Sequence, residues 1–214
     1  MNVKEIIILA GGKGKRLRPM TDNMPKCLVP VNGKPLLEIQ RDCLKSQGIE
    51  KIILACGHLW EKIKEKYGDE FIYSVETEPL GTGGAIKKAM EYVEGERFFV
   101  MNSDEYSDIN FRELEKLNGI VVALSQFNCR FGLVDTEDEF VTGFRQKPVL
   151  PYWANMGVYV FTKDIELPDK GAFETETFPD LADERKLKAY KHKGTWITVN
   201  TIKDLEKLEN FLKR

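Results

Sequence analysis

The chain has few of the residues that build metal centres or disulfide frameworks. Among its 214 residues are two histidines, His58 and His192, far apart, and four cysteines with no C-x-x-C pair. A zinc site made of His and Cys is therefore not expected. Scattered single cysteines are typical of reduced thiols, which indicates a cytoplasmic protein.

Long apolar runs and an excess of one charge are also lacking. No apolar run approaches the length of a membrane-spanning helix, and the N-terminus leads straight into a predicted strand without a signal-peptide pattern. The formal net charge is −2, which favours neither a nucleic acid nor an anionic membrane as partner. Any anion site must be local. The length suits a single domain over residues 1–214.

Strands and helices alternate along the sequence. The apolar run at 6–9 is typical of a parallel strand covered on both faces. This alternation predicts a doubly wound, mostly parallel α/β sheet, in which ligands bind at the carboxyl ends of the strands. Further strands are expected at 51–56, 71–75, 97–104, 120–125, 187–191 and 195–199, with short strands and turns over 127–163. Helices are expected at 35–47, 59–68, 81–93, 110–117, 173–184 and 204–214, and Pro179 is expected to start a second part of the helix at 173–184.

A glycine-rich, cationic segment follows the first strand, at the edge where ligands are expected. Glycines there let backbone N–H groups approach a ligand, and the clustered cations repel one another until a polyanion such as a triphosphate is bound. A solvated surface loop is the alternative. Two familiar phosphate motifs do not match, because Arg16 stands where the Walker pattern needs Ser or Thr, and Leu17 stands at the third glycine of the dinucleotide pattern.

The segment ILAGGKGKRLRPMTDNMPKCLVPVNGKPLLE (8–38) resembles the signature of the sugar-1-phosphate nucleotidyltransferases, the NDP-sugar pyrophosphorylases. Lys15 departs from that signature, in which a small hydroxyl residue is usual. The resemblance is strongest to the mannose- and heptose-1-phosphate guanylyltransferases, covers nearly the whole chain and implies a Rossmann-like, GT-A-like fold. It continues in family order through EPLGTGGAI (78–86), NSD (102–104), GFRQKP (143–148), NMGVYVF (155–161) and WITVNTIKDLE (196–206).

The resemblance implies that a sugar-1-phosphate oxygen attacks the α-phosphorus of a nucleoside triphosphate, with Mg²⁺ as cofactor and pyrophosphate as leaving group. Arg16 would hold the β- and γ-phosphates, and Lys26 would bridge the α-phosphate and the incoming phosphate. With Asp104 these are the predicted catalytic residues. Nucleotide contacts are expected from Leu9, Ala10, Gly11, Gly12, Gly14, Lys15, Glu76, Gly81 and Thr82, and sugar-phosphate contacts from Gln146, Lys147, Asn155 and Gly157.

Asp104, at the end of a predicted strand, is the expected magnesium ligand, because Mg²⁺ prefers carboxylate and phosphate oxygens. A turn or helix cap is the alternative. Many relatives place a second acid where Thr198 stands here. A variant of the family uses an Asn after Val, which fits Asn200. We assign the second ligand to Asn200, although Thr198 and a capping role for Asn200 stay open.

Glu76 bears on the choice of base. It lies five residues before Gly81, where thymidylyltransferases typically hold Gln. Guanine presents two adjacent donors that one carboxylate can accept, so Glu76 favours GTP over UTP, dTTP or CTP. A solvent-facing acid at a strand end is the alternative.

The departures at Ser103, Gln146 and Thr198 motivate a second hypothesis, a catalytically weak regulatory paralogue that binds an NDP-sugar. The sequence ends after the last predicted helix, so the C-terminal β-helix domain of some relatives is not expected. The identity of the sugar and the existence of a homo-oligomer stay open.

Overall fold

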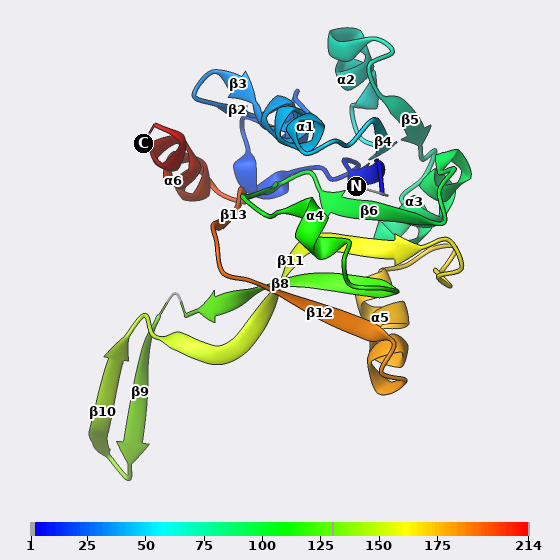
Figure 1. Cartoon of the computed structure of the whole chain (residues 1–214). Coiled ribbons are helices and arrows are strands. Elements are labelled where there is room, and N and C mark those ends of the chain that lie inside the picture. The colour runs from blue at the N-terminus through cyan, green and yellow to red at the C-terminus, as the bar shows by residue number, and fades with distance from the viewer. Residues whose placement is uncertain (1–2, 130, 214) are drawn as a thin grey trace.

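The computed structural model describes residues 3–129 and 131–213 and is organised around a seven-stranded sheet (Figure 1). The strand order is β12-β8-β11-β6-β1-β4-β5. Only β11 runs antiparallel to its neighbours, so the predicted mixed, mostly parallel sheet is confirmed. The strands are β1 (Glu5–Leu9), β4 (Lys51–Cys56), β5 (Ile72–Val75), β6 (Arg97–Asn102), β8 (Ile120–Asn128), β11 (Val149–Thr162) and β12 (Leu187–His192).

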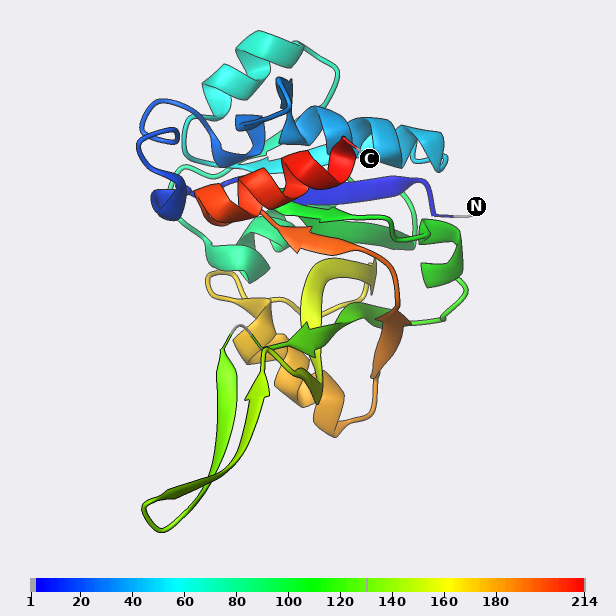
Figure 2. The same cartoon turned by 90° about the vertical axis from the view of Figure 1, so that its left-hand side faces the viewer.

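Helices cover both faces of this sheet, and short strand pairs lie outside it, one of which projects away from the other elements (Figure 2). Among the described residues, no helix is long and apolar enough to cross a membrane. The helices are α1 (Leu36–Ser46), α2 (Trp60–Tyr67), α3 (Gly81–Ala89), α4 (Phe111–Leu114), α5 (Phe173–Asp183) and α6 (Ile202–Leu212), with 3-10 turns η1 (Lys15–Leu17), η2 (Lys26–Leu28) and η3 (Met90–Tyr92). The short pairs are β2 (Pro30–Val31) with β3 (Lys34–Pro35), β7 (Glu105–Ser107) with β13 (Trp196–Thr198), and β9 (Gly132–Glu137) with β10 (Phe140–Gln146).

The alternation of side chains along β1 explains why both faces of the sheet are covered. Successive strand residues point to opposite faces. Ile6 and Ile8 therefore pack with the apolar side chains of α1, α2 and α4, whereas Ile7 packs with those of α3 and α5. All three isoleucines are fully buried, as expected for a central parallel strand. Because other elements cover both faces of β1, only the loop at its carboxyl end can contact a ligand.

An aromatic cluster anchors α5 to β11. Phe173 is fully buried, and its ring centroid lies 5.2 Å from that of Tyr159 and 4.9 Å from that of Phe178. We expect Phe173→Ala to lower the free energy of unfolding by about 3–5 kcal/mol, because the lost ring leaves a cavity that rigid neighbours cannot fill. Urea denaturation followed by circular dichroism measures this change. Phe140→Ala, at a position that is 72% exposed, is the matched control and should change stability by about 0.5 kcal/mol or less.

Three local predictions are corrected by the structure. The helix predicted at 110–117 is only the short α4, although Asn110 caps it as predicted by accepting from the backbone N–H of Arg112. Pro179 does not start a second part of α5, which runs through it while Phe173 and Phe178 hold the helix to the core. In the region 127–163, the predicted short strands are confirmed by the β9–β10 hairpin, but the remainder forms one long strand, β11, instead of short ones.

Candidate active site

The glycine-rich loop leaves β1 and turns through η1 and η2. Gly14 has a φ of +60°, a left-handed conformation that favours glycine, and a Cβ there would lie 2.9 Å from Cγ2 of Thr21. The Thr21 hydroxyl donates to the Gly14 carbonyl oxygen at 2.8 Å and fixes the turn. The two short 3-10 turns that follow begin with Lys15 and Lys26. The loop therefore folds back and places its cations at the carboxyl edge of the sheet.

Asn200 reaches this edge from the far end of the chain. Asp104 follows β6, and the next strand, β7, pairs antiparallel with β13, so that Thr198 lies opposite Glu105. The backbone N–H of Val199 then donates to the Asp104 carbonyl oxygen at 2.8 Å. This pairing brings Asn200 beside Asp104. The next residue, Thr201, caps α6 in a capping box with Asp204, so the stretch that carries Asn200 ends where this helix begins.

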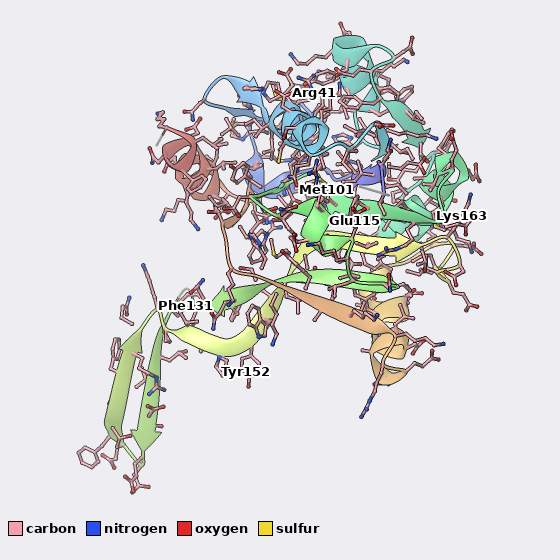
Figure 3. The ribbon with its side chains drawn as sticks, in the orientation of Figure 1. Arg41, Met101, Glu115, Phe131, Tyr152 and Lys163 are labelled. Atoms are coloured by element: carbon pink, nitrogen blue, oxygen red, sulfur yellow. The ribbon has the colours of Figure 1, made fainter. Side chains whose placement is uncertain are left out.

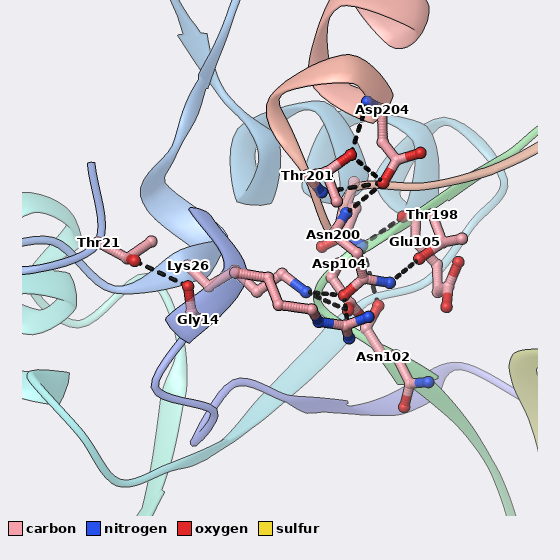
Figure 4. Close-up of polar contacts among 12 residues, drawn as sticks. Gly14, Thr21, Lys26, Asn102, Asp104, Glu105, Thr198, Asn200, Thr201 and Asp204 are labelled. Atoms are coloured by element: carbon pink, nitrogen blue, oxygen red, sulfur yellow. Dashed lines mark hydrogen bonds and ion pairs between the residues drawn. The ribbon is translucent and has the colours of Figure 1, made fainter. Parts of the chain in front are cut away.

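Lys26, Asp104, Asn200 and Arg16 form one hydrogen-bonded group (Figure 4). The Lys26 ammonium donates to Asp104 Oδ2 and, at 2.8 Å, to Asn200 Oδ1. Arg16 Nη2 donates to the same Asn200 oxygen at 2.7 Å. The Asn200 side-chain N–H donates to the Thr198 hydroxyl, which turns its carbonyl oxygen towards the two cations. The side chains of Lys26 and Asp104 are 13% and 23% exposed, so their charges are only partly screened by water.

These residues line a cavity of about 480 Å³ at the carboxyl ends of β1, β4 and β6. Its lining includes three cations and two acids, which leaves a small positive excess suited to a polyanion. The predicted site residues that line the cavity are Leu9, Gly11, Gly12, Gly14, Lys15, Arg16, Lys26, Glu76, Gly81, Thr82, Asp104 and Asn200. The lining also contains five residues that the sequence analysis missed: Ala55, Pro79, Ala85, Asn102 and Ser103.

Glu76 and the N-terminus of α3 form one wall of the cavity. The Glu76 backbone N–H donates to the Cys56 carbonyl oxygen at 2.8 Å, which holds the residue beside the end of β4. Its Oε2 accepts from the Leu80 N–H at 3.0 Å, and its Oε1 lies against Gly11, where a Cβ would come within 3.1 Å. Gly81 has a φ of +74°, and a Cβ there would lie 2.3 Å from the Gly171 carbonyl oxygen, so a larger residue does not fit.

Five predicted site residues do not line the cavity. Ala10 is buried one residue behind it, and its N–H donates to the Ala55 carbonyl oxygen at 2.8 Å. Gly157 packs against Asn102, a lining residue, while Asn155 donates to the Tyr159 hydroxyl at 2.8 Å. Gln146 and Lys147 are exposed at the base of the β9–β10 hairpin, outside the cavity wall.

Glu105, which the sequence analysis missed, is buried directly behind Asp104. Its carboxylate accepts from the Trp196 indole N–H at 2.7 Å. Burial raises the pKa of Glu105 to about 8, with a further increase from the charge of Asp104 and an opposing effect of the indole hydrogen bond. Nothing in the local sequence distinguishes this acid from a surface one, because its burial depends on the pairing of β7 with β13.

The oxygen atoms of the site suit a hard divalent cation. Asp104 Oδ2 and Asn200 Oδ1 both accept from the one Lys26 ammonium, so the two oxygens lie close together and face a point that this ammonium occupies in the structure. Within residues 3–129 and 131–213, no three His, Cys, Asp or Glu side chains gather as a complete metal cage. Mg²⁺ commonly takes one or two protein oxygens and completes its shell with phosphate oxygens and water. The donor set therefore fits Mg²⁺ bound together with a phosphorylated ligand.

A cavity outside the carboxyl ends of a mostly parallel sheet, faced by glycine backbone and cations, defines an α/β protein that binds phosphorylated ligands. Comparison with known proteins agrees with this class. Residues 5–214 match the family model described as nucleotidyl transferase. The chain is 41% identical over 198 residues to D-glycero-alpha-D-manno-heptose 1-phosphate guanylyltransferase of Campylobacter jejuni, covering 86% of this chain and 88% of that protein.

Two further relatives extend the comparison. Mannose-1-phosphate guanyltransferase of Yarrowia lipolytica is 34% identical to this chain. The alignment covers 92% of this chain and 61% of that enzyme. The crystal structure of HddC from Yersinia pseudotuberculosis superposes with a TM-score of 0.80 at 28% identity, covering 98% of this chain and all of that one, and a second structure of HddC contains GMP-PN. The chain belongs to the nucleotidyl transferase family, which confirms the resemblance seen in its sequence.

Proposed function

We propose that this nucleotidyltransferase transfers a guanylyl group from GTP to a sugar 1-phosphate, giving a GDP-sugar and pyrophosphate. One observation carries the proposal: Arg16, Lys26, Asp104 and Asn200, from three separate segments, converge on a single cavity. The related enzymes of C. jejuni and Y. lipolytica are named as guanylyltransferases of sugar 1-phosphates, which supports the choice of substrates.

The reaction needs alignment of two anions more than it needs acid–base chemistry. An oxygen of the sugar 1-phosphate forms a bond to the α-phosphorus, and the bond from that phosphorus to the bridging oxygen of the β-phosphate breaks. Pyrophosphate leaves with the electron pair. Lys26, which lines the cavity, would neutralise the α-phosphate and the incoming phosphate, whose mutual repulsion opposes the attack.

Arg16 would bind the part of the triphosphate that leaves. Its guanidinium is anchored to Asn200 and lines the same cavity as Gly12 and Gly14, whose backbone N–H groups can face phosphate oxygens. Asp104 and Asn200 would hold Mg²⁺, which when bound would make the α-phosphorus more electrophilic and offset negative charge. Lys147, which the family resemblance assigns to the sugar phosphate, is exposed at the base of the β9–β10 hairpin outside the cavity lining, so it would have to extend its long side chain towards the cavity to make that contact.

The experiment that tests this proposal is a matrix of four nucleoside triphosphates against a panel of sugar 1-phosphates, scored by pyrophosphate release. We expect release with GTP together with mannose 1-phosphate or a heptose 1-phosphate. Binding of a GDP-sugar without release under any pair would instead identify the regulatory paralogue. Release that is fastest with UTP, dTTP or CTP would keep the chemistry and overturn the choice of GTP.

Glu76→Gln tests the recognition of the base. The carboxylate accepts from the Leu80 N–H through one oxygen and retains acceptor capacity towards the cavity. Loss of a charged acceptor for the guanine donors should lower kcat/KM for GTP by about 10- to 100-fold and shift preference towards UTP or dTTP. Glu78→Gln, in the same loop but paired with Lys170 outside the cavity, is the matched control. Unchanged ratios of kcat/KM would remove Glu76 from base recognition.

A further inference from the structure

A buried glutamine interrupts the apolar face of α1. The buried residues of this helix are Leu36, Leu37, Gln40 and Leu44, so Gln40 stands where the helical spacing favours another apolar side chain. It is only 4% exposed. A buried amide costs free energy unless its polar atoms are hydrogen-bonded, so the contacts of Gln40 indicate what this side chain contributes.

The packing of α1 against the sheet directs Gln40 towards the end of β6. Leu37 of the helix and Met101 of the strand belong to one apolar cluster. Figure 3 shows Arg41, the next residue after Gln40, on the outer side of α1, and Met101 on the sheet below the helix. Gln40 faces inward, where β6 ends at Asn102 and the chain turns towards β7.

The Gln40 amide nitrogen donates to both ends of this turn. Nε2 donates to the Asn102 carbonyl oxygen at 3.1 Å and to the Glu105 carbonyl oxygen at 2.7 Å. Ser103 and Asp104 are the two residues between β6 and β7, so the two bonds span them, and residues 102–105 are called the Asp104 turn below. A side-chain amide suits this place because its NH₂ group carries two donors.

Two backbone bonds hold the same turn from other directions. The Ser103 N–H donates to the Leu9 carbonyl oxygen at 3.2 Å, which ties the turn to β1. The Asp104 carbonyl oxygen accepts from the Val199 N–H at 2.8 Å, which ties it to the segment after β13. Gln40 adds a third attachment, from α1, and it is the one that joins the two ends of the turn to each other.

The oxygen of the Gln40 amide gains nothing from its burial. Within residues 3–129 and 131–213, this buried Oε1 accepts no hydrogen bond. A buried acceptor without a partner is destabilising, which offsets part of the benefit of the two donated bonds. The stability of the fold alone therefore gives a weak reason for a glutamine here, and the contact of its nitrogen with the Asp104 turn gives a stronger one.

We propose that Gln40 is a positioning residue that holds the Asp104 turn so that the Asp104 carboxylate faces the cavity beside Lys26 and Asn200. This inference rests on the proposed function, in which Asp104 holds Mg²⁺. Gln40 is not among the residues that line the cavity, so it acts through the backbone of the turn. Without its two bonds the turn gains conformational freedom, and the carboxylate spends less time in the orientation that binds the cation.

Gln40→Met tests this role, with Gln47→Met as the matched control. Met has a similar length and no N–H donor. Gln47, at the C-terminal end of the same helix, donates to the Ile109 carbonyl oxygen at 3.1 Å and accepts from the Phe111 N–H at 2.9 Å, so it holds the start of α4 instead. Each variant loses two side-chain bonds to backbone, and the comparison separates a loss of stability from a loss of positioning.

Hydrogen–deuterium exchange measures the turn itself and requires no activity. In Gln40→Met, the amides of residues 102–107 should exchange about 5-fold faster or more than in the unmodified protein, while those of residues 109–114 keep their rate. Gln47→Met should give the reverse pattern. Unchanged exchange over residues 102–107 in Gln40→Met overturns the proposal. If circular dichroism shows that Gln40→Met is unfolded, Gln40→Leu replaces it with the same expectation.

Mn²⁺ binding connects the turn to the site. Electron paramagnetic resonance in the presence of a non-hydrolysable GTP analogue should show that Gln40→Met raises the dissociation constant of Mn²⁺ by about 10-fold or more, whereas Gln47→Met leaves it within about 3-fold. Faster exchange of the Asp104 turn without weaker Mn²⁺ binding would make Gln40 a merely structural residue and overturn the proposal.

Steady-state kinetics give the third measurement. Gln40→Met should lower kcat for pyrophosphate release by about 10-fold or more while KM for GTP stays within about 3-fold, because Arg16 and the glycine-rich loop keep their places. An equal rise of KM without a loss of kcat contradicts the positioning of Asp104. If the unmodified protein releases no pyrophosphate with any substrate pair, the proposed function fails, whereas exchange and Mn²⁺ binding still decide whether Gln40 positions Asp104.

Discussion

Replacing Lys26 with Met is expected to lower kcat for pyrophosphate release by about 10²- to 10³-fold while the fold is kept. The Lys26 side chain is only 13% exposed, and its ammonium donates to both Asp104 and Asn200, so it is held in the cavity that we propose binds the two phosphates. Met keeps most of the length of the side chain but removes its charge and its hydrogen-bond donors to Asp104 and Asn200. Steady-state pyrophosphate assays with saturating GTP and sugar 1-phosphate measure the loss.

Lys13→Met is the matched control for this variant. Lys13 belongs to the same cationic loop, is exposed and does not line the cavity, so its replacement should change kcat by less than about 3-fold. If the loop acts only through its general positive charge, the two variants will lose similar amounts of activity at low salt. That result would contradict a specific role for Lys26.

Replacing Asp104 with Asn is expected to lower kcat by a similar factor, about 10²- to 10³-fold, and to raise the Mg²⁺ concentration needed for half-maximal activity. Asn keeps an acceptor for the Lys26 ammonium but loses the negative charge that would hold the cation beside Asn200. Binding of Mn²⁺ in the presence of a non-hydrolysable GTP analogue, followed by electron paramagnetic resonance, measures the metal site without turnover.

Asp108→Asn is the control for the metal site. Asp108 lies four residues further along, where its Oδ1 accepts from the Thr195 N–H at 2.7 Å and lies 2.8 Å from His192 Nε2, away from the cavity lining. Its replacement should leave Mn²⁺ binding unchanged. Equal loss of Mn²⁺ binding in both variants would contradict a specific role for Asp104 as a metal ligand. Unchanged binding in Asp104→Asn would mean that other residues hold the cation.

The strands and the glycine-rich loop could be predicted because their signals are local. The apolar run of β1 and the glycines after it lie within ten residues, and the same short segment carries Lys15 and Arg16. Asp104, which lines the cavity, was predicted for the same reason, since it follows closely after the recognisable strand β6. Only the buried second part of the long strand β11 was predicted as a strand, because its first part is largely exposed and lacks a continuous apolar pattern.

The other residues at the cavity, and the contacts that place them there, could not be predicted from local sequence. Glu105 resembles any surface acid in sequence, yet it is buried, and the Trp196 indole that donates to it lies 91 residues away. The lining residues Ala55 and Ala85 are small apolar side chains with no chemical signature, and they reach the cavity only because β4 and α3 end there. Gln146 and Lys147, expected at the sugar phosphate, lie at the base of an arm whose direction no local pattern determines.

The amino-acid sequence by itself determined the alternation of the main strands and helices, the family and the chemical types of the site residues, because these follow from local patterns of apolar, glycine and charged residues. Only the tertiary structure decided which of them meet. The pairing of β7 with β13 brings Asn200 next to Asp104 across 96 positions of chain, and Lys26 joins them from a third segment. Contacts at such separations depend on strand pairing and core packing, which local sequence does not encode.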